Sequence, residues 1–471
     1  MPREKLLLPK RLAVLAIALL AWSTGFSRSV SAKALALVPA KAGAPSASAS
    51  TSVEVPPVSY RQRALPNGLE VYSVEDHSAP VVAIQVWYHV GSVDDPPGRS
   101  GFAHLFEHMM FKSTAHMKSE TMDRLTEDVG GYNNASTTDD TTYYYEEVPS
   151  NYLQTLLWAE ADRMGSLNVN EANFKSERSV VEEEFRTSVL APPYGLFAYA
   201  IDKDSFVASP YHRPTIGSIE DLEQATLADV QKFHATYYRP DNATLIVAGD
   251  FDPKQLDAWV DEYFGPIAKP DAPIPRPDAN EPPRREAKTV QENGPNVPLP
   301  ALAITWLTPP RSSPDFYPLT IAAVILGQGE SSRLYQSLVY RQQIASDVGA
   351  DADAREDAGI FVVNATVASG KTLDEVNKGI DAELRAIEEK PVSDAELEKA
   401  KNQLITGQLR RRETNDGKAF SIGYDATVVH DASEVNNGIR KFEAVTAADV
   451  QRVMKQYLAD AKPLTIDYVS K

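Results

Sequence analysis

The chain has 471 residues, of which 43% are hydrophobic and 24% charged, a balance that fits a folded protein and excludes intrinsic disorder, collagen and a multi-span membrane protein. Cysteine is absent, so disulfides, thiolate zinc clusters and cysteine nucleophiles are excluded, and any metal site must use His, Asp or Glu. The formal net charge of −18 argues against nucleic acid and anionic membranes as partners, because both attract basic surfaces.

Residues 1–34 have the pattern of a secretory signal peptide. Basic residues precede an apolar run from Leu12 to Trp22, and small residues at Val30–Ala32 and Ala32–Ala34 offer cleavage sites. A mitochondrial presequence is the alternative, but such segments are amphipathic with spaced arginines, whereas this apolar run is continuous and too short to span a bilayer. We therefore predict export to the periplasm or the medium, with no stable membrane insertion once the signal is removed. Residues 35–57, rich in Ala, Pro and Ser, are predicted to be a flexible tether.

A proline-rich stretch divides the rest of the chain. Residues 266–298 contain so much proline and charge that neither a helix nor a central strand could run far. We interpret them as a linker between a first domain, 58–265, and a second domain, 299–471.

The two domains share a weak internal repeat at a shift of about 220 residues. Thr226 and Asp229 have counterparts in Thr446 and Asp449, and each pair predicts a capped helix followed by an apolar strand, at 243–248 and 464–469 respectively. The strand-like segment Ala83–Trp87 likewise corresponds to Ala303–Trp306. Gene duplication is therefore the favoured interpretation.

Long helices are predicted over 151–166, 171–190 and 372–389, interspersed with short alternating strands. This mixture predicts an α+β fold with one helix-covered sheet in each half.

The strongest chemical signal is the segment His104-Leu-Phe-Glu107-His108. On a helix, His104 and His108 lie one turn apart on the same face, so their imidazoles can bind one ion. Glu107 lies beside them, where its carboxylate can reach a water molecule on that ion and act as a general base. The neighbouring positions are apolar, which predicts a buried helix and an apolar environment that excludes water from the site.

A hydrolytic zinc site needs three protein ligands and one open position, so a further ligand must come from elsewhere. The acidic segment 177–184 offers candidates. Glu177 and Glu184 are two helical turns apart and share a face, whereas Glu182 and Glu183 point away from it.

Each of these patterns also has a plain structural explanation. A single histidine on an apolar helix is usually a packed core residue, and a run of glutamates is usually a solvated helix face. Two histidines one turn apart with a glutamate between them are much less often structural. The glutamates gain significance only from that pair.

The segment from His104 to His108 resembles the inverted zinc protease motif of the pitrilysin family, the inverzincins, to which insulysin and the mitochondrial processing peptidase belong. The similarity extends to the glycine-containing approach at 91–103, to 131–144, to the acidic segment 177–184 and, in the second half, to 326–335. It covers residues 58–471.

This resemblance implies two homologous halves, each a mainly antiparallel sheet covered by helices, that face each other across a substrate cavity. It implies Zn²⁺ bound by His104, His108 and Glu184, with Glu177 in a supporting role. It also implies that peptides bind by strand addition near Asn134, Ala135 and Thr137. Shifted by the repeat, His104 corresponds to Val324 in an apolar run, so we expect no zinc site in the second half.

One position departs from the family pattern. Active members carry, in a second-half domain, an arginine followed seven residues later by a tyrosine, and the pair holds substrate against the zinc. Here Arg341 is followed by Val348, and valine cannot donate a hydrogen bond to an oxyanion or a carbonyl. We therefore expect Arg341 to contact substrate, and we expect a homologous partner subunit, in a heterodimer or homodimer, to supply the complete pair.

Together these observations predict a zinc endopeptidase that hydrolyses peptides or unfolded polypeptides with Glu107 as the general base. Two alternatives stay open. The chain can be a non-catalytic scaffold subunit of the same fold, or a peptidase that processes specific precursors.

The remaining motifs have structural interpretations. Gly327 and Gly329 lie in a glycine-containing stretch that lacks the following Gly-Lys-Ser/Thr, which favours a turn over a phosphate loop. The other histidines lack metal-ligand spacing and are interpreted as structural or surface residues: His77, His89, His116, His212, His234 and His430.

Overall fold

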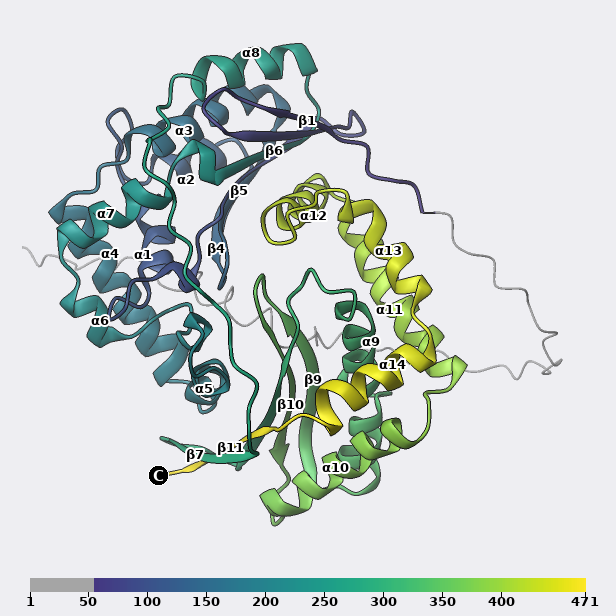
Figure 1. The fold of residues 1–471 in the computed structure, drawn as a ribbon. Coiled ribbons are helices and arrows are strands. Elements are labelled where there is room, and N and C mark those ends of the chain that lie inside the picture. Colours follow the sequence, from purple (N-terminus) through teal and green to yellow (C-terminus); the bar gives the residue numbers. More distant parts are fainter. Residues whose placement is uncertain (1–54) are drawn as a thin grey trace, which may run out of the picture. The chain divides into compact units, whose positions relative to one another are not determined.

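The computed structural model describes residues 55–471 (Figure 1). The predicted signal peptide and nearly all of the predicted tether lie outside the described residues.

The first sheet has the strand order β1-β2-β6-β3-β5-β4. Its strands are β1 (Arg61–Ala64), β2 (Glu70–Glu75), β3 (Val81–Tyr88), β4 (Tyr132–Thr137), β5 (Thr142–Pro149) and β6 (Ala243–Gly249). The second sheet has the order β7-β11-β8-β10-β9. Its strands are β7 (Lys288–Gly294), β8 (Ala301–Thr308), β9 (Ala345–Ala354), β10 (Gly359–Val367) and β11 (Leu464–Ser470).

The two sheets have the same topology once the extra strand β1 is set aside. In each, one neighbouring pair is parallel, β2 with β6 and β11 with β7, and the other pairs are antiparallel. The predicted strands at 83–87, 243–248, 303–306 and 464–469 all lie within these sheets. The shared strand order confirms the predicted α+β class with two homologous, mainly antiparallel halves.

Helices follow the strands in the same sequence in both halves. The first half contains α1 (Phe102–Met109), α2 (Thr121–Glu127), α3 (Leu153–Ser166), α4 (Glu171–Glu184), α5 (Gly195–Ser205), α6 (Ile219–Gln224), α7 (Leu227–Tyr237) and α8 (Pro253–Tyr263). The second contains α9 (Phe316–Gly327), α10 (Leu373–Glu389), α11 (Asp394–Arg411), α12 (Asn415–Thr427), α13 (Glu434–Ala444) and α14 (Ala447–Met454). Three π-helices, η4 (Phe185–Leu190), η7 (Tyr335–Arg341) and η8 (Lys455–Ala459), follow α4, α9 and α14 among the described residues.

Both predicted capping boxes are present. The Thr226 hydroxyl accepts from the Asp229 amide at the start of α7, and Asp229 accepts in return from the Thr226 amide. Thr446 and Asp449 repeat the arrangement at the start of α14. Each box satisfies two amides that the first turn leaves without helical partners.

The core of the first half lies on one face of its sheet. Alternate residues of β3 point to opposite faces. Ile84 and Val86 join the main apolar cluster, which also contains buried residues of α1, α3 and α7. Trp87 points to the other face.

That other face is covered by a helix from the second half. Ala419 and Ile422 of α12 share an apolar cluster with Trp87 and Ile246. A Cβ atom on Gly423 would come within 2.2 Å of the Trp87 indole nitrogen, so only glycine allows the helix to approach so closely.

The second sheet receives a helix from the first half in return. Phe197 and Ala200 of α5 cluster with Ala301, Ala303 and Ile466. The two halves therefore exchange equivalent helices, and the predicted division at 58–265 and 299–471 separates each sheet from one of its covering helices. The physical reason is that an amphipathic helix fits any apolar sheet face, so its sequence does not identify which sheet it covers.

The predicted linker contains more structure than expected. Up to residue 287 it is free of helix and strand, but residues 288–294 form β7 at the edge of the second sheet, paired with β11. The proline content of this stretch excludes a central strand but allows a strand at the edge of a sheet.

Candidate metal centre and active site

The helix that carries the histidine motif is started by a glycine and an aspartate. Gly101 has φ +91°, and a Cβ atom there would lie 2.8 Å from the Ile216 carbonyl oxygen. The buried Asp95 carboxylate accepts hydrogen bonds from the amides of Gly101 (2.6 Å) and Ala103 (2.9 Å). These contacts fix where α1 begins and thus which side chains face the site.

His104 and His108 both lie on α1 and both direct Nε2 toward Glu184 of α4. The Glu184 Oε2 atom is 3.8 Å from His104 Nε2 and 3.2 Å from His108 Nε2. Bond lengths of about 2.0–2.1 Å in a tetrahedral zinc site put ligand atoms about 3.3 Å apart. The observed separations lie on either side of that value, and the three ligand atoms lie within 4.8 Å of one another.

The environment of His104 supports this fit. His104 is only 2% exposed, its Nδ1 atom has no hydrogen-bond partner among the described residues, and its Nε2 atom faces Glu184 Oε2 at 3.8 Å. Buried polar atoms in proteins nearly always have partners. The unpartnered atom is Nδ1, on the far side of the ring from Nε2. The support for a metal is that Nε2 and Glu184 Oε2 are separated by 3.8 Å, a gap that an ion bound by both atoms can occupy.

The protonation preferences of the three side chains differ. Burial lowers the pKa of His104, which favours the neutral imidazole that binds a metal. Burial acts in the same direction on His108, but contact with Glu184 outweighs it and leaves the pKa of His108 raised. Burial acts to raise the pKa of Glu184, but contact with the two imidazoles outweighs it, and the net pKa is lowered.

Helix α4 presents Glu177 and Glu184 on one face, as the spacing predicts. Val181, on the same side, is fully buried, whereas Glu183 is exposed and pairs with Arg186 at 3.4 Å. Glu182 faces Arg178 and Arg186 at 3.6 and 3.5 Å. Directly after Glu184 the helix widens into the π-helix η4, a feature frequent at functional sites.

Glu177 is buried behind the histidines. Its carboxylate is 2.7 Å from Lys112 Nζ and 4.0 Å from His108 Nδ1, and it accepts from the Ser176 hydroxyl at 2.9 Å. It therefore lies beside the edge of the His108 ring that faces away from Glu184. This is the position of a residue that orients a ligand rather than one that reacts.

Glu107 is tied to the edge of the first sheet. The Thr137 hydroxyl donates to Glu107 Oε2 at 2.7 Å. Thr137 ends β4, the outermost strand on that side, and Asn134 and Ala135 lie in the same strand. The carboxylate beside the histidines and the open strand edge thus meet at one point.

Two family models match successive parts of this chain. The family model described as insulinase (peptidase family M16) matches residues 70–217, and the one described as peptidase M16 inactive domain matches residues 224–404. The zinc protease PqqE of Helicobacter pylori is 31% identical over 404 residues, which cover 85% of this chain and 91% of that protein. This chain belongs to the M16 peptidase family.

A further sequence relative and a solved structure support the same family assignment. The probable mitochondrial-processing peptidase subunit beta of Arabidopsis thaliana is 26% identical over 408 residues, covering 85% of this chain and 76% of that protein. The crystal structure of a protease from Helicobacter pylori aligns with a TM-score of 0.84 at 29% identity, covering 88% of this chain and all of that one. The predicted resemblance to the pitrilysin and insulysin family is confirmed. The histidine and glutamate group lies entirely in the part matched as insulinase and outside the part matched as inactive domain. Its members are His104, Glu107, His108, Glu177 and Glu184.

Arg341 makes no hydrogen bond or ion pair with the histidine and glutamate group among the described residues. It ends the π-helix η7, its side chain is 62% exposed, and its guanidinium is 3.9 Å from Glu383. No hydrogen bond or ion pair within residues 55–471 joins it to the first half. Val348 is buried in β9 opposite Ala365.

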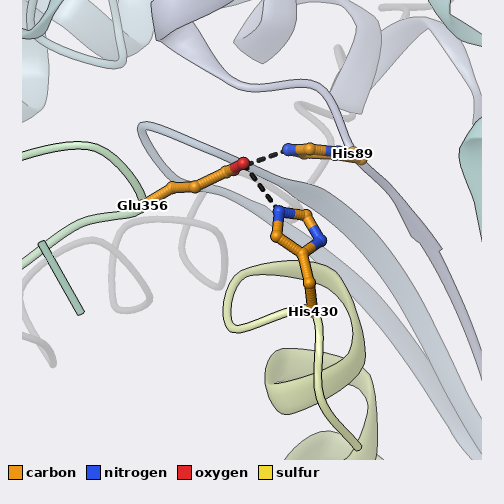
Figure 2. A group of neighbouring side chains, drawn as sticks. All are labelled: His89, Glu356 and His430. Carbon is orange, nitrogen blue, oxygen red and sulfur yellow. Dashed lines mark hydrogen bonds and ion pairs between the residues drawn. The ribbon is translucent and has the colours of Figure 1, made fainter. Parts of the chain in front are cut away.

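Sequence reasoning missed one group of polar side chains in this M16 chain. His89 and His430, interpreted separately as structural or surface residues, both contact Glu356 (Figure 2). Their positions are far apart in the sequence, so no local spacing could have revealed the group.

Proposed function

We propose that this M16 peptidase is a zinc-dependent endopeptidase in which His104, His108 and Glu184 bind the metal. The observation that carries the proposal is the convergence of both imidazole Nε2 atoms on one carboxylate oxygen of Glu184, with Glu107 on the same helix. Two neutral histidines and one carboxylate are also the donor set of well-known hydrolytic zinc sites.

A bound zinc ion supplies Lewis acidity, which polarises the scissile carbonyl and lowers the pKa of water. The chain's own residues handle the proton. Thr137 fixes Glu107 Oε2, so Oε1 is the atom that takes a proton from the attacking water and passes it to the nitrogen of the leaving amine. Glu177, which is itself paired with Lys112, lies beside the far side of His108 and keeps its ring in place.

The substrate is a peptide or unfolded polypeptide in extended form. The β4 strand pairs with β5 on one side only, so its outer edge is free to pair with a substrate backbone. Because Thr137 ends this strand beside Glu107, a peptide added here runs directly past the site. Recognition by backbone pairing selects peptides for their extended conformation more than for the identity of their side chains.

The direct test is Glu107→Gln. The amide keeps the size of the side chain but cannot accept the proton, so we expect full zinc content by elemental analysis with kcat reduced about 10²- to 10⁴-fold. Glu183→Gln, an exposed change in α4, is the matched control and should leave both quantities unchanged. Turnover within twofold of wild type in Glu107→Gln would remove this residue from the mechanism.

We further propose that the chain acts with a homologous partner subunit. Val348 stands where active members carry tyrosine, and Arg341 makes no contact with the zinc group within the described residues. The β subunit naming of the Arabidopsis relative is consistent with a paired arrangement. Purification from the native compartment should recover a second M16-like chain, and full turnover by this chain alone would contradict the proposal.

We also propose that the protein is exported to the periplasm or the medium, on the basis of the signal-like residues 1–34. Within residues 55–471, no helix has both the length and the apolar character needed to cross a membrane. Mass spectrometry of the mature amino terminus is the test, and an intact Met1 on the protein isolated from its native compartment would contradict export.

A non-catalytic scaffold subunit is the second candidate. Val348 and the match of residues 224–404 to an inactive domain favour it. A scaffold needs no metal. If removal of zinc changed neither the assembly of the complex nor the peptidase turnover of that complex, the scaffold would be favoured over the enzyme.

A further inference from the structure

A second group of metal-type ligands lies outside the M16 site. His89 directly follows β3, Glu356 lies in the turn between β9 and β10, and His430 lies between α12 and α13. Figure 2 shows both imidazoles turned toward the Glu356 carboxylate. His89 Nε2 is 2.6 Å from Oε2, His430 Nε2 is 2.8 Å from Oε1, and the ligand atoms of the group lie within 4.8 Å of one another.

The backbone around these side chains is held in place. The Glu356 amide donates to Asp140 Oδ2 at 3.0 Å, and the preceding Arg355 is buried among acidic residues, 2.9 Å from Asp139. The His89 amide donates to the Asn242 carbonyl at 3.0 Å. Two of the three ligands thus sit on segments that are fixed before any ion arrives, which lowers the ordering cost of binding.

The group opens onto a cavity. His89 and His430 line a hollow of about 660 Å³, together with Asp241 and Asp431, so an ion has a path of entry and acidic walls along it. Arg276 is the opposing charge. Its guanidinium donates to the His89 carbonyl oxygen at 2.6 Å and is 3.7 Å from the Asp94 carboxylate.

We propose that His89, Glu356 and His430 form a second site for a divalent transition-metal ion of the zinc type. The donor set is the same as at the first site, two imidazoles and one carboxylate. The present contacts are hydrogen bonds of 2.6 and 2.8 Å, and a bound ion would widen them to about 3.3 Å, a movement of about 0.5–0.7 Å.

The position of the site gives it a structural role. His89 belongs to the first half, Glu356 to the hairpin of the second sheet, and His430 to the loop after the exchanged helix α12. One ion bound by all three joins the two halves at the point where α12 lies on the first sheet. It stabilises the folded chain because unfolding separates its ligands.

Zinc stoichiometry after equilibrium dialysis against a zinc buffer tests the site. We expect two ions per chain in the wild type, one in His430→Asn, one in His108→Asn and none in the double variant. Asparagine is chosen because His430 has φ +57°, which asparagine tolerates. Equal zinc content in the wild type and His430→Asn would overturn the proposal.

The matched control is His77→Asn. His77 also contacts two carboxylates, Asp250 at 2.6 Å and Glu75 at 2.8 Å, but through opposite ring nitrogens, so these three cannot enclose one ion. Its loss should leave the stoichiometry at two. Glu356→Gln provides a second variant for the same loss.

A stability readout separates this site from the proposed active site. Added zinc should raise the unfolding temperature of His108→Asn, which retains the second site, and the rise attributable to that site should vanish in the His108→Asn, His430→Asn double variant. Peptidase turnover should survive His430→Asn. If His108→Asn alone loses no zinc, the proposed active site fails while the second site stands, so the two failures are distinguishable.

Discussion

Truncating Ile422 to alanine tests the exchange of helices between the two halves. Ile422 is completely buried in α12, in one apolar cluster with Trp87 and Ile246 of the first sheet. The change removes three carbon atoms, which corresponds to about 2.4 kcal/mol of transfer free energy. The cavity left behind adds to this, so we expect a loss of unfolding free energy within the range of about 2–5 kcal/mol.

The matched control is Ile380→Ala. Ile380 is equally buried, but in the core that the second half forms on its own sheet. Both variants should lose similar stability. They should differ in location, because only Ile422→Ala releases α12 from the strands of the first half.

Hydrogen exchange followed by mass spectrometry measures that location. In Ile422→Ala, peptides from α12 and from β3 should exchange faster together, whereas Ile380→Ala should leave β3 unaffected. A loss of less than about 1 kcal/mol in Ile422→Ala, or exchange that rises in α12 without any change in β3, would refute the exchanged-helix arrangement.

Further predictions concern the site. Glu177→Gln should weaken zinc binding about 10- to 100-fold, measured by competition with a chromogenic chelator, because the residue orients His108; unchanged affinity would deny it that role. Gly101→Ala should lower both thermal stability and zinc occupancy, since the new Cβ meets the Ile216 carbonyl at 2.8 Å. Gly98→Ala, also at positive φ but with open space around it, should be milder, and equal effects would contradict the steric argument. Peptides N-methylated near the scissile bond should show KM raised at least about tenfold, because they cannot pair with β4; equal KM would exclude strand addition.

Local patterns predicted the repeat and its helices well. The pairs Thr226–Asp229 and Thr446–Asp449 specify their capping boxes within four residues, so no distant contact was needed to find them. The strands at 83–87 and 303–306 were likewise readable from β-branched and apolar residues alone.

The histidine pair was predictable for the same reason, since one helical turn brings His104 and His108 together. The carboxylate that faces the two histidines was harder to predict. Helical spacing reduced the acidic segment to Glu177 and Glu184, and only the family resemblance distinguished between them. In the structure Glu184 faces Nε2 of both imidazoles, and Glu177 faces Nδ1 of His108.

Features that depend on long-range packing were not predictable. The apolar residues of α5 and α12 show that these helices are half-buried, but not on which sheet. The contacts of Glu356 with His89 and His430 join three segments whose proximity is set by the fold of both halves. No periodicity in the sequence carries that information.

The most direct measurement of the central claim is diffraction from crystals of the zinc-loaded protein on both sides of the zinc absorption edge. The account predicts an anomalous peak about 2.0–2.1 Å from the Nε2 atoms of His104 and His108 and from the Glu184 carboxylate. A loaded crystal with no peak between these three side chains, or with Glu184 turned away and no other acid in its place, would contradict it.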